Sequence, residues 1–326
     1  MVGEYPPVMA SETDMALPPG FQNGFDKYSS FRPMGTGGRA EILACRDTAL
    51  GRTVAMKQLQ AKYADNSQLR RRFLREARLT AQLQHPNTVP VYEIGYQPDG
   101  ELYFTMKKVA GRNLYQILVS LYRKEEDTVA EFPMDRLLDI LIQVGYVLSY
   151  AHIHGVIHRD VKPENILVGL FGEVVLLDWG IARIWGMPNE DPSPQTSPED
   201  YETLDGTGQR PGTPLYMSPE QVLGRIVDER SDIYSLGVVL YEMLTFSLPF
   251  QGPDVRSTFE KIVEESLQPP SERTPERAIP AGLESICLQA LAKNPAERFQ
   301  SMRDLIKAIR DFRTRAMLSG DPGDPA

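Results

Sequence analysis

Residues 158–165 read HRDVKPEN, between the apolar triplets GVI at 155–157 and ILV at 166–168. Short apolar runs of this kind are typical of buried strands. The loop between them carries His, Arg, Asp, Lys, Glu and Asn, and loops joining buried elements are a frequent place for catalytic and binding groups. The stretch therefore predicts a functional loop held between two strands inside the fold.

Three side chains of this loop suit the transfer of a phosphoryl group. Asp160 can accept a proton from an attacking hydroxyl, Lys162 can neutralise charge on the transferring group, and the amide oxygen of Asn165 can ligate Mg2+. A second carboxylate should complete the metal site. Asp178 in VVLLDWG follows apolar residues, where a divalent cation would offset the cost of burying its charge.

Apolar runs separated by turns dominate the first third of the chain, and they predict an antiparallel sheet. The expected strands are EILACRD at 41–47, TVAMKQL at 53–59, VPVYEIGY at 89–96 and ELYFTMKKV at 101–109. One helix is expected at 68–83, and helical periodicity prevails from residue 113 onward. The pattern predicts an α+β protein with a small β-rich lobe followed by a larger helical lobe.

The composition predicts where the folded part of the chain begins and ends. Residues 1–25 and 315–326 contain Pro and Gly without periodic apolar positions, so both are expected to be flexible tails. The folded part then spans 26–314, with an N-lobe at 26–109 and a C-lobe at 110–314. Residues 187–212 are rich in Pro, Ser, Thr and acid, which is consistent either with a solvated loop or with a functional one.

Charge and cysteine content limit the partners and the compartment. The 326-residue chain has a net charge of -9, which argues against nucleic acid or an anionic membrane as the main partner. No apolar run reaches the roughly 18 residues that a membrane span needs. Two cysteines are too few for a disulfide framework. We expect a cytoplasmic protein without a membrane span.

A glycine-rich stretch, MGTGGRAEILA, lies at the start of the expected sheet. Gly35, Gly37 and Ala40 fit a pattern shared by dinucleotide-binding loops and kinase loops. A dinucleotide fold requires a helix after the glycines, whereas here another strand follows. The P-loop pattern is also missing from the sequence. The stretch therefore predicts a phosphate-covering loop that is followed by a strand, a turn and a second strand.

A cation and a carboxylate are expected to pair beside that loop. Lys57 ends the run VAMK, and Glu76 shares one face of the 68–83 helix with Leu69, Phe73 and Thr80. A carboxylate on an inward face requires a cation. Lys57 is favoured as the partner over Arg72, which lies one turn back on the same helix.

Eight motifs occur in a fixed order along residues 31–312: GTGGRAEI, VAMK, REA, HRDVKPEN, DWG, GTPLYMSPE, SDIYSLG and NPAERF. With these motifs the chain resembles the Hanks-type, eukaryotic-like serine/threonine protein kinases, especially their bacterial branch. The resemblance implies the two-lobed protein-kinase fold, with an activation segment at 178–220. Departures from the usual pattern include Trp179 in place of Phe and Ser218 in place of Ala.

The resemblance also implies roles for individual residues. Lys57, backed by Glu76, would contact the α and β phosphates, Asp160 would be the catalytic base, and Asn165 and Asp178 would hold the metal. Lys162 and Thr213 match the serine/threonine type. The implied nucleotide-binding residues are Gly35, Thr36, Gly37, Gly38, Ile42, Ala55, Lys57, Met106, Lys107, Val109 and Leu167.

Three further residues are expected to support the site structurally. His158 is expected to pack and hydrogen-bond near the DWG turn rather than to carry out acid or base chemistry. Asp232 is expected to cap backbone amides of the catalytic loop. Glu220 is expected to pair with Arg298.

The activity implied is transfer of the γ-phosphoryl group of ATP to Ser and Thr hydroxyls of proteins, with Mg2+ as cofactor and Mn2+ as the alternative ion. The implied partners are ATP, protein substrates and a second copy of the chain for trans-autophosphorylation. Autophosphorylation candidates in the activation segment are Thr196, Ser197, Thr203 and Thr207. The main alternative is a kinase-shaped scaffold without catalysis, and a small-molecule kinase or nucleotide oxidoreductase comes last.

Overall fold

The computed structural model describes residues 24–36, 40–179, 182–184 and 214–319. The chain divides into two compact units, one made of Met1–Gln84 with Val89–Gly111 and the other of His85–Thr88 with Arg112–Ala326. The boundary expected at residues 109/110 lies two residues before the observed one. The short segment His85–Thr88 belongs to the second unit.

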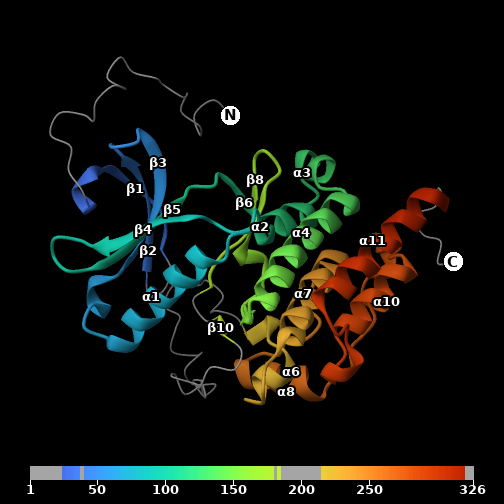
Figure 1. Ribbon diagram of the computed structural model, residues 1–326. Coiled ribbons are helices and arrows are strands. Elements are labelled where there is room, and N and C mark those ends of the chain that lie inside the picture. The colour runs from blue at the N-terminus through green and yellow to red at the C-terminus, as the bar shows by residue number, and fades with distance from the viewer. Residues whose placement is uncertain (1–23, 37–39, 180–181, 185–213, 320–326) are drawn as a thin grey trace. The chain divides into compact units, whose positions relative to one another are not determined.

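The first unit is built on a five-stranded antiparallel sheet in the order β1-β2-β3-β5-β4 (Figure 1). Its strands are β1 (Tyr28–Thr36), β2 (Ala40–Asp47), β3 (Arg52–Leu59), β4 (Val91–Tyr96) and β5 (Leu102–Lys107). Its helical elements are α1 (Ser67–Gln82) and the 3-10 turns η1 (Gly24–Lys27) and η2 (Ala61–Tyr63).

Strand β1 was not predicted. It lies at the edge of the sheet, and most of its side chains are exposed, so it carries no alternating apolar pattern. It also contains Pro33, which lacks a backbone donor and is tolerated only at sheet edges or irregular positions. The register between β1 and β2 shifts on both sides of Arg32 and Pro33, as expected for an irregular edge strand.

Helix α1 packs on one face of the sheet because its inward positions are apolar. Asn66 caps the helix by accepting from the backbone N–H groups of Gln68 and Leu69. Phe73 and Phe104 meet with ring centroids 5.2 Å apart in the core on this side of the sheet. A second core on the opposite face contains Tyr28, Cys45, Val54, Met56 and Tyr103.

The second unit is mainly helical, with short strands at one end. Its strands are β6 (Gly111–Asn113), β7 (Val156–Ile157), β8 (Ile166–Gly169), β9 (Val174–Leu176) and β10 (Arg183–Ile184). Its helices are α2 (Leu114–Tyr122), α3 (Glu126–Glu131), α4 (Met134–Ile153), α6 (Pro219–Val222), α7 (Glu229–Thr245), α8 (Val255–Glu264), α9 (Pro270–Arg273), α10 (Ala281–Ala290) and α11 (Met302–Ser319). Its 3-10 turns are η3 (Pro163–Asn165), η4 (Pro214–Tyr216), η5 (Pro275–Arg277) and η6 (Pro295–Glu297).

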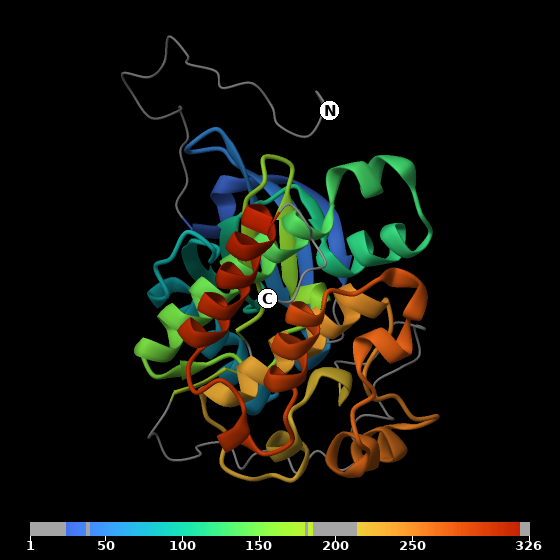
Figure 2. The same ribbon diagram turned by 90° about the vertical axis from the view of Figure 1, so that its right-hand side faces the viewer.

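Helix α7 is the centre of this unit. Every residue from Ser231 to Thr245 is buried, and the helix contacts α4, α10 and α11 (Figures 1 and 2). A helix buried on all sides belongs to the interior of a domain. At Gly237 an added Cβ would lie 2.8 Å from the Cβ of Ala290, so this glycine allows α10 to approach closely.

The ordered structure extends beyond both expected tail boundaries. At the start, η1 includes Gly24 and Phe25, because the Phe25 ring packs edge-on against Tyr103 at 5.3 Å and Lys27 pairs with Glu93. At the end, α11 continues to Ser319 rather than ending at 314. Arg313 anchors it to α4 through two acids, with Nε 2.7 Å from Asp135 Oδ1 and Nη1 2.5 Å from Asp139 Oδ1.

Candidate active site

Strands β1 and β2 flank the glycine stretch and are antiparallel. The sequence predicts the strand after the glycines but not the one before them. Gly35 and Thr36 end β1 and pair with Ile42 and Glu41 of β2. An added Cβ at Gly35 would meet no protein atom within 4 Å. Packing among the described residues therefore does not require glycine at this position, whereas close approach of a phosphate group would. Gly37 and Gly38 lie outside the described residues.

Lys57 and Glu76 form the expected ion pair, with Nζ 2.5 Å from Oε1. Side chains alternate along a strand, so Lys57 lies on the same face of β3 as Leu59, which belongs to the core against α1. Glu76 is buried on the α1 side of that core, together with Phe73 and Ala77. The pair thus forms because strand alternation directs Lys57, and helical periodicity directs Glu76, toward the same core.

Three of the expected nucleotide-binding residues, Ile42, Ala55 and Met106, share that face. Directly paired residues of an antiparallel sheet point to the same side. Ile42 is paired with Lys57, and Ala55 is paired with Met106. Of the other expected nucleotide-binding residues, Lys107 is exposed and Val109 is buried, while Leu167 belongs to β8 of the second unit. The sheet therefore presents Lys57 and three of the other expected nucleotide-binding residues on one face.

In the second unit, the loop 158–165 connects two buried strands, β7 and β8. Lys162 Nζ lies 2.7 Å from Asp160 Oδ2. Asn165 Nδ2 donates to Asp160 O at 2.9 Å and to Asp160 Oδ2 at 3.1 Å. The three side chains assigned to transfer chemistry are therefore directly connected around the Asp160 carboxylate.

Asp178 belongs to the same group. It follows β9, and the preceding Leu177 donates its N–H to Asn165 O at 2.8 Å. Its φ of 63° lies in the left-handed region, which is unfavourable for a residue with a side chain and persists only where surrounding contacts hold it. Its charge is one of the causes that raise the pKa of Asp160.

The electrostatics of the loop favour a proton acceptor beside a stable cation. Burial raises the pKa of Asp160 above its ordinary value; Lys162 opposes this and Asp178 adds to it. Burial alone would lower the pKa of Lys162, but the adjacent Asp160 carboxylate outweighs burial and raises it. Lys162 thus stays charged, and Asp160 holds a proton more strongly than an exposed aspartate does.

Asp232 of α7 holds the backbone of the loop, as expected. Its Oδ2 accepts from His158 N at 2.9 Å and its Oδ1 from Arg159 N at 2.8 Å. Burial would raise the pKa of Asp232, but the hydrogen bond from His152 leads the groups that lower it. A fully buried carboxylate therefore remains charged and fixes the start of the loop.

His158 also has the expected packing role. Its Nδ1 accepts from Asp160 N at 3.2 Å, so its proton is on Nε2, which faces Leu177 O at 3.0 Å. Its ring meets Trp179 edge-on, with centroids 4.5 Å apart. Because the neutral ring uses both nitrogens in backbone hydrogen bonds, His158 connects the loop to the segment that carries Asp178.

The oxygen ligands present fit a magnesium ion. Asn165 uses Nδ2 for Asp160, so its Oδ1 is the atom that can coordinate. Within the described part of the chain no group of three or more His, Cys, Asp or Glu side chains could hold a metal by itself. Mg2+ typically takes one or two carboxylates together with substrate phosphates, which suits Asn165 and Asp178.

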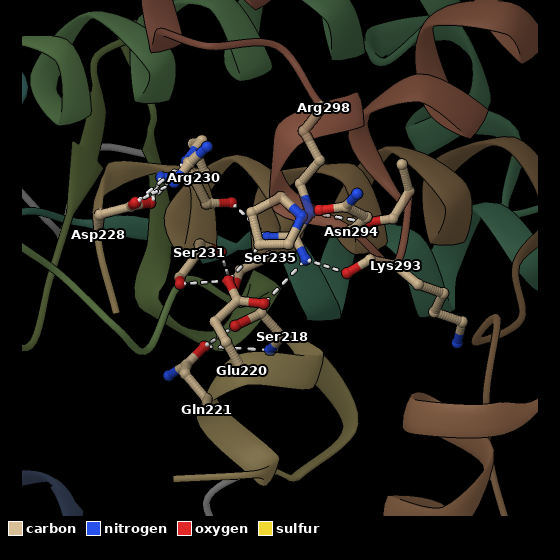
Figure 3. A network of polar contacts seen from close by, with 12 residues as sticks. Ser218, Glu220, Gln221, Asp228, Arg230, Ser231, Ser235, Lys293, Asn294 and Arg298 are labelled. Carbon is tan, nitrogen blue, oxygen red and sulfur yellow. Dashed lines mark hydrogen bonds and ion pairs between the residues drawn. The ribbon is translucent and has the colours of Figure 1, made fainter. Parts of the chain in front are cut away.

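A buried network lies at the end of the segment 178–220 (Figure 3). Arg298 donates Nη1 to Glu220 Oε1 at 2.7 Å and Nη2 to Glu220 Oε2 at 2.8 Å, which confirms the expected pair. Ser231 also donates to Glu220, at 2.5 Å. Arg298 further contacts the carbonyls of Ala292, Lys293 and Arg230. The network anchors α6 to α7 and to the segment before α11.

Two contacts of this region were not predicted. His152 Nε2 lies 2.8 Å from Asp232 Oδ2. Gln221 donates to the carbonyl of Arg159, 62 residues earlier. Neither residue belongs to a local pattern that would identify such a long-range partner. Thr213 and the phosphorylation candidates Thr196, Ser197, Thr203 and Thr207 lie outside the described residues.

The fold, the Lys57–Glu76 pair and the group of polar residues around Asp160 together define a protein kinase. The family model described as protein kinase domain matches residues 28–308, so the chain belongs to the protein kinase family. This confirms the family and the two-lobed α+β fold expected from the sequence. Members of this family use ATP and a divalent metal ion.

The chain is similar to bacterial serine/threonine-protein kinases named PknD. It is 38% identical over 308 residues to that of Chlamydia trachomatis, covering 91% of this chain and 32% of the relative. It is 38% identical over 313 residues to that of Chlamydia muridarum, covering 90% of this chain and 33% of the relative. It is 39% identical over 304 residues to that of Chlamydia pneumoniae, covering 91% and 32%. The chain thus spans about a third of the length of these relatives.

None of the helices that the structure describes is long and apolar enough to cross a membrane.

Proposed function

We propose that this chain is a serine/threonine protein kinase that transfers the γ-phosphoryl group of ATP to Ser and Thr hydroxyls of proteins. The observation that carries the proposal is the connected group Asp160, Lys162 and Asn165, followed by Asp178. A catalytically silent scaffold would not need a partly buried carboxylate with a raised pKa beside a charged lysine.

Each side chain has a role that its surroundings support. Asp160 accepts the proton of the substrate hydroxyl, and Lys162 stabilises negative charge on the transferring group. Asn165 Oδ1 and the Asp178 carboxylate hold Mg2+, with Mn2+ as the alternative ion, and the ion when bound neutralises phosphate charge. Lys57, oriented by Glu76, contacts the α and β phosphates.

Preference for Ser and Thr rests on Lys162 within KPEN, on the resemblance at Thr213, and on the names of the relatives. The Ser and Thr residues in 178–220 support autophosphorylation between two copies of the chain. A cytoplasmic location is supported by the two buried, unpaired cysteines, Cys45 and Cys287.

The deciding experiment measures transfer of labelled phosphate from ATP to the protein itself and to a generic basic protein, followed by phosphoamino acid analysis. We expect phosphoserine and phosphothreonine that disappear when a chelator removes the divalent ion. Nucleotide binding without transfer, at saturating Mg2+ and Mn2+, would support the scaffold alternative instead.

The Lys57–Glu76 pair provides a separate prediction. Glu76→Gln keeps the side-chain shape but removes the charge that holds the Lys57 ammonium, so we expect kcat/KM for ATP to fall on the order of 10- to 100-fold. Steady-state kinetics at varied ATP measure it. Arg78→Gln, at an exposed position of the same helix, is the matched control and should change kcat/KM less than about twofold. Equal effects of the two variants would contradict the assigned role.

A further inference from the structure

The peptide unit between Arg159 and Asp160 is held at both ends. Its N–H, on Asp160, donates to His158 Nδ1 at 3.2 Å. Its C=O, on Arg159, accepts from Gln221 Nε2 at 3.0 Å. Arg159 itself has a φ of 70°, in the left-handed region that residues with side chains rarely adopt. An unfavourable backbone conformation persists only where surrounding contacts hold it.

Gln221 is itself held in one orientation. Its Oε1 accepts from Ser218 N at 3.1 Å and from Ser218 Oγ at 3.1 Å (Figure 3). A backbone N–H can only donate and a carbonyl can only accept, so these partners identify Oε1 and Nε2 without ambiguity. The adjacent Glu220 is fixed by Arg298 in the buried network. The Gln221 amide is therefore aimed at Arg159 from a rigid support.

We propose that Gln221 is a positioning residue for catalysis, and that Ser218 orients it. Gln221 holds the Arg159 carbonyl, Asp232 holds the Arg159 N–H, and His158 holds the Asp160 N–H. Together these contacts fix the backbone at Asp160 and so set the direction in which its side chain points. Rotation of the 159–160 peptide would break the bonds at both of its ends. The proposal rests on the proposed kinase function, and it adds a residue outside the loop that carries the chemistry.

A purely local role for Gln221 is the competing explanation, because Ser218 and Gln221 also form a capping box at the start of α6. The variant Gln221→Glu separates the two explanations. A carboxylate at this position can still accept from Ser218 and cap the helix, but it cannot donate to the Arg159 carbonyl. A capping role alone therefore leaves Gln221→Glu neutral or stabilising.

We expect Gln221→Glu to lower kcat about 10- to 100-fold, since a small misplacement of a catalytic group has effects of this size. KM for ATP and the thermal unfolding midpoint should stay near the wild-type values. Ser218→Ala should lower kcat by a smaller factor, because Ser218 N still orients the amide. Gln82→Glu is the matched control, since Gln82 also donates its amide to a backbone carbonyl, that of Arg78, on an exposed surface.

Amide hydrogen exchange at Asp160, followed by NMR, provides a readout that does not depend on transfer. We expect Gln221→Glu, but not Gln82→Glu, to speed this exchange about tenfold or more, because the 159–160 peptide loses one of its two anchors. Unchanged kcat and unchanged exchange in Gln221→Glu would overturn the proposal. If the wild type transfers no phosphate, the proposed function fails, and the exchange measurement still decides whether Gln221 holds this peptide.

Discussion

Asp160→Asn is expected to slow phosphoryl transfer by a factor on the order of 10² to 10⁴, the range that a positioned proton acceptor contributes. The amide has nearly the same shape, and its oxygen can still accept from Lys162 and Asn165. It cannot take the hydroxyl proton, however. We therefore expect ATP affinity and stability to change little. Single-turnover transfer from labelled ATP measures the rate, and calorimetry measures nucleotide binding.

The control for this variant is Asp127→Asn, which removes a carboxylate from an exposed position of α3 in the same unit. It should transfer phosphate at the wild-type rate. A wild-type rate in Asp160→Asn would show that the proton acceptor lies elsewhere. Loss of both transfer and nucleotide binding would point to a structural effect of the substitution, and the assignment of Asp160 as base would not be supported.

The elements predicted best are those whose apolar pattern is complete within one segment. Strands β2 and β3 and helix α1 were each expected within two residues of their observed bounds, because the two strands are short apolar runs bounded by turns and the helix buries one regular apolar face. Strand β1 could not be recognised, since an exposed edge strand with a proline has no such face. The C-terminal part of α11 was missed because its anchor, Arg313, bonds acids of α4 far away in the sequence.

The same distinction separates the site residues that were found from those that were missed. Asp160, Lys162 and Asn165 are within five residues of each other, so their chemistry could be read from one loop. The Lys57–Glu76 pair could be predicted because the alternation of the strand and the periodicity of the helix direct both side chains toward the same core. Gln221 and His152 act through single contacts to distant elements, and their helices carry no sequence signal for such contacts.

The Glu220–Arg298 pair predicts a large effect on stability. We expect Glu220→Gln to lower the free energy of unfolding at about pH 7 by about 3–5 kcal/mol, the usual cost of removing one partner from a buried ion pair. The guanidinium of Arg298 would remain fully buried without its counter-charge. Urea denaturation measures the change. Glu260→Gln breaks an exposed ion pair with Arg256 and should cost less than about 1 kcal/mol.

The pH dependence of this loss has a defined sign. Burial would raise the pKa of Glu220, but the hydrogen bonds and charge of Arg298 outweigh it and lower the pKa below its ordinary value. A carboxyl group whose pKa is lower in the folded state stabilises the protein above its unfolded-state pKa, and this stabilisation is lost as pH falls through the folded-state value. The stability gap between wild type and Glu220→Gln should therefore be widest near neutral pH and narrow on acidification below about pH 4.5. A gap that stays constant down to the acid unfolding of the wild type would mean that Glu220 is not held charged by Arg298.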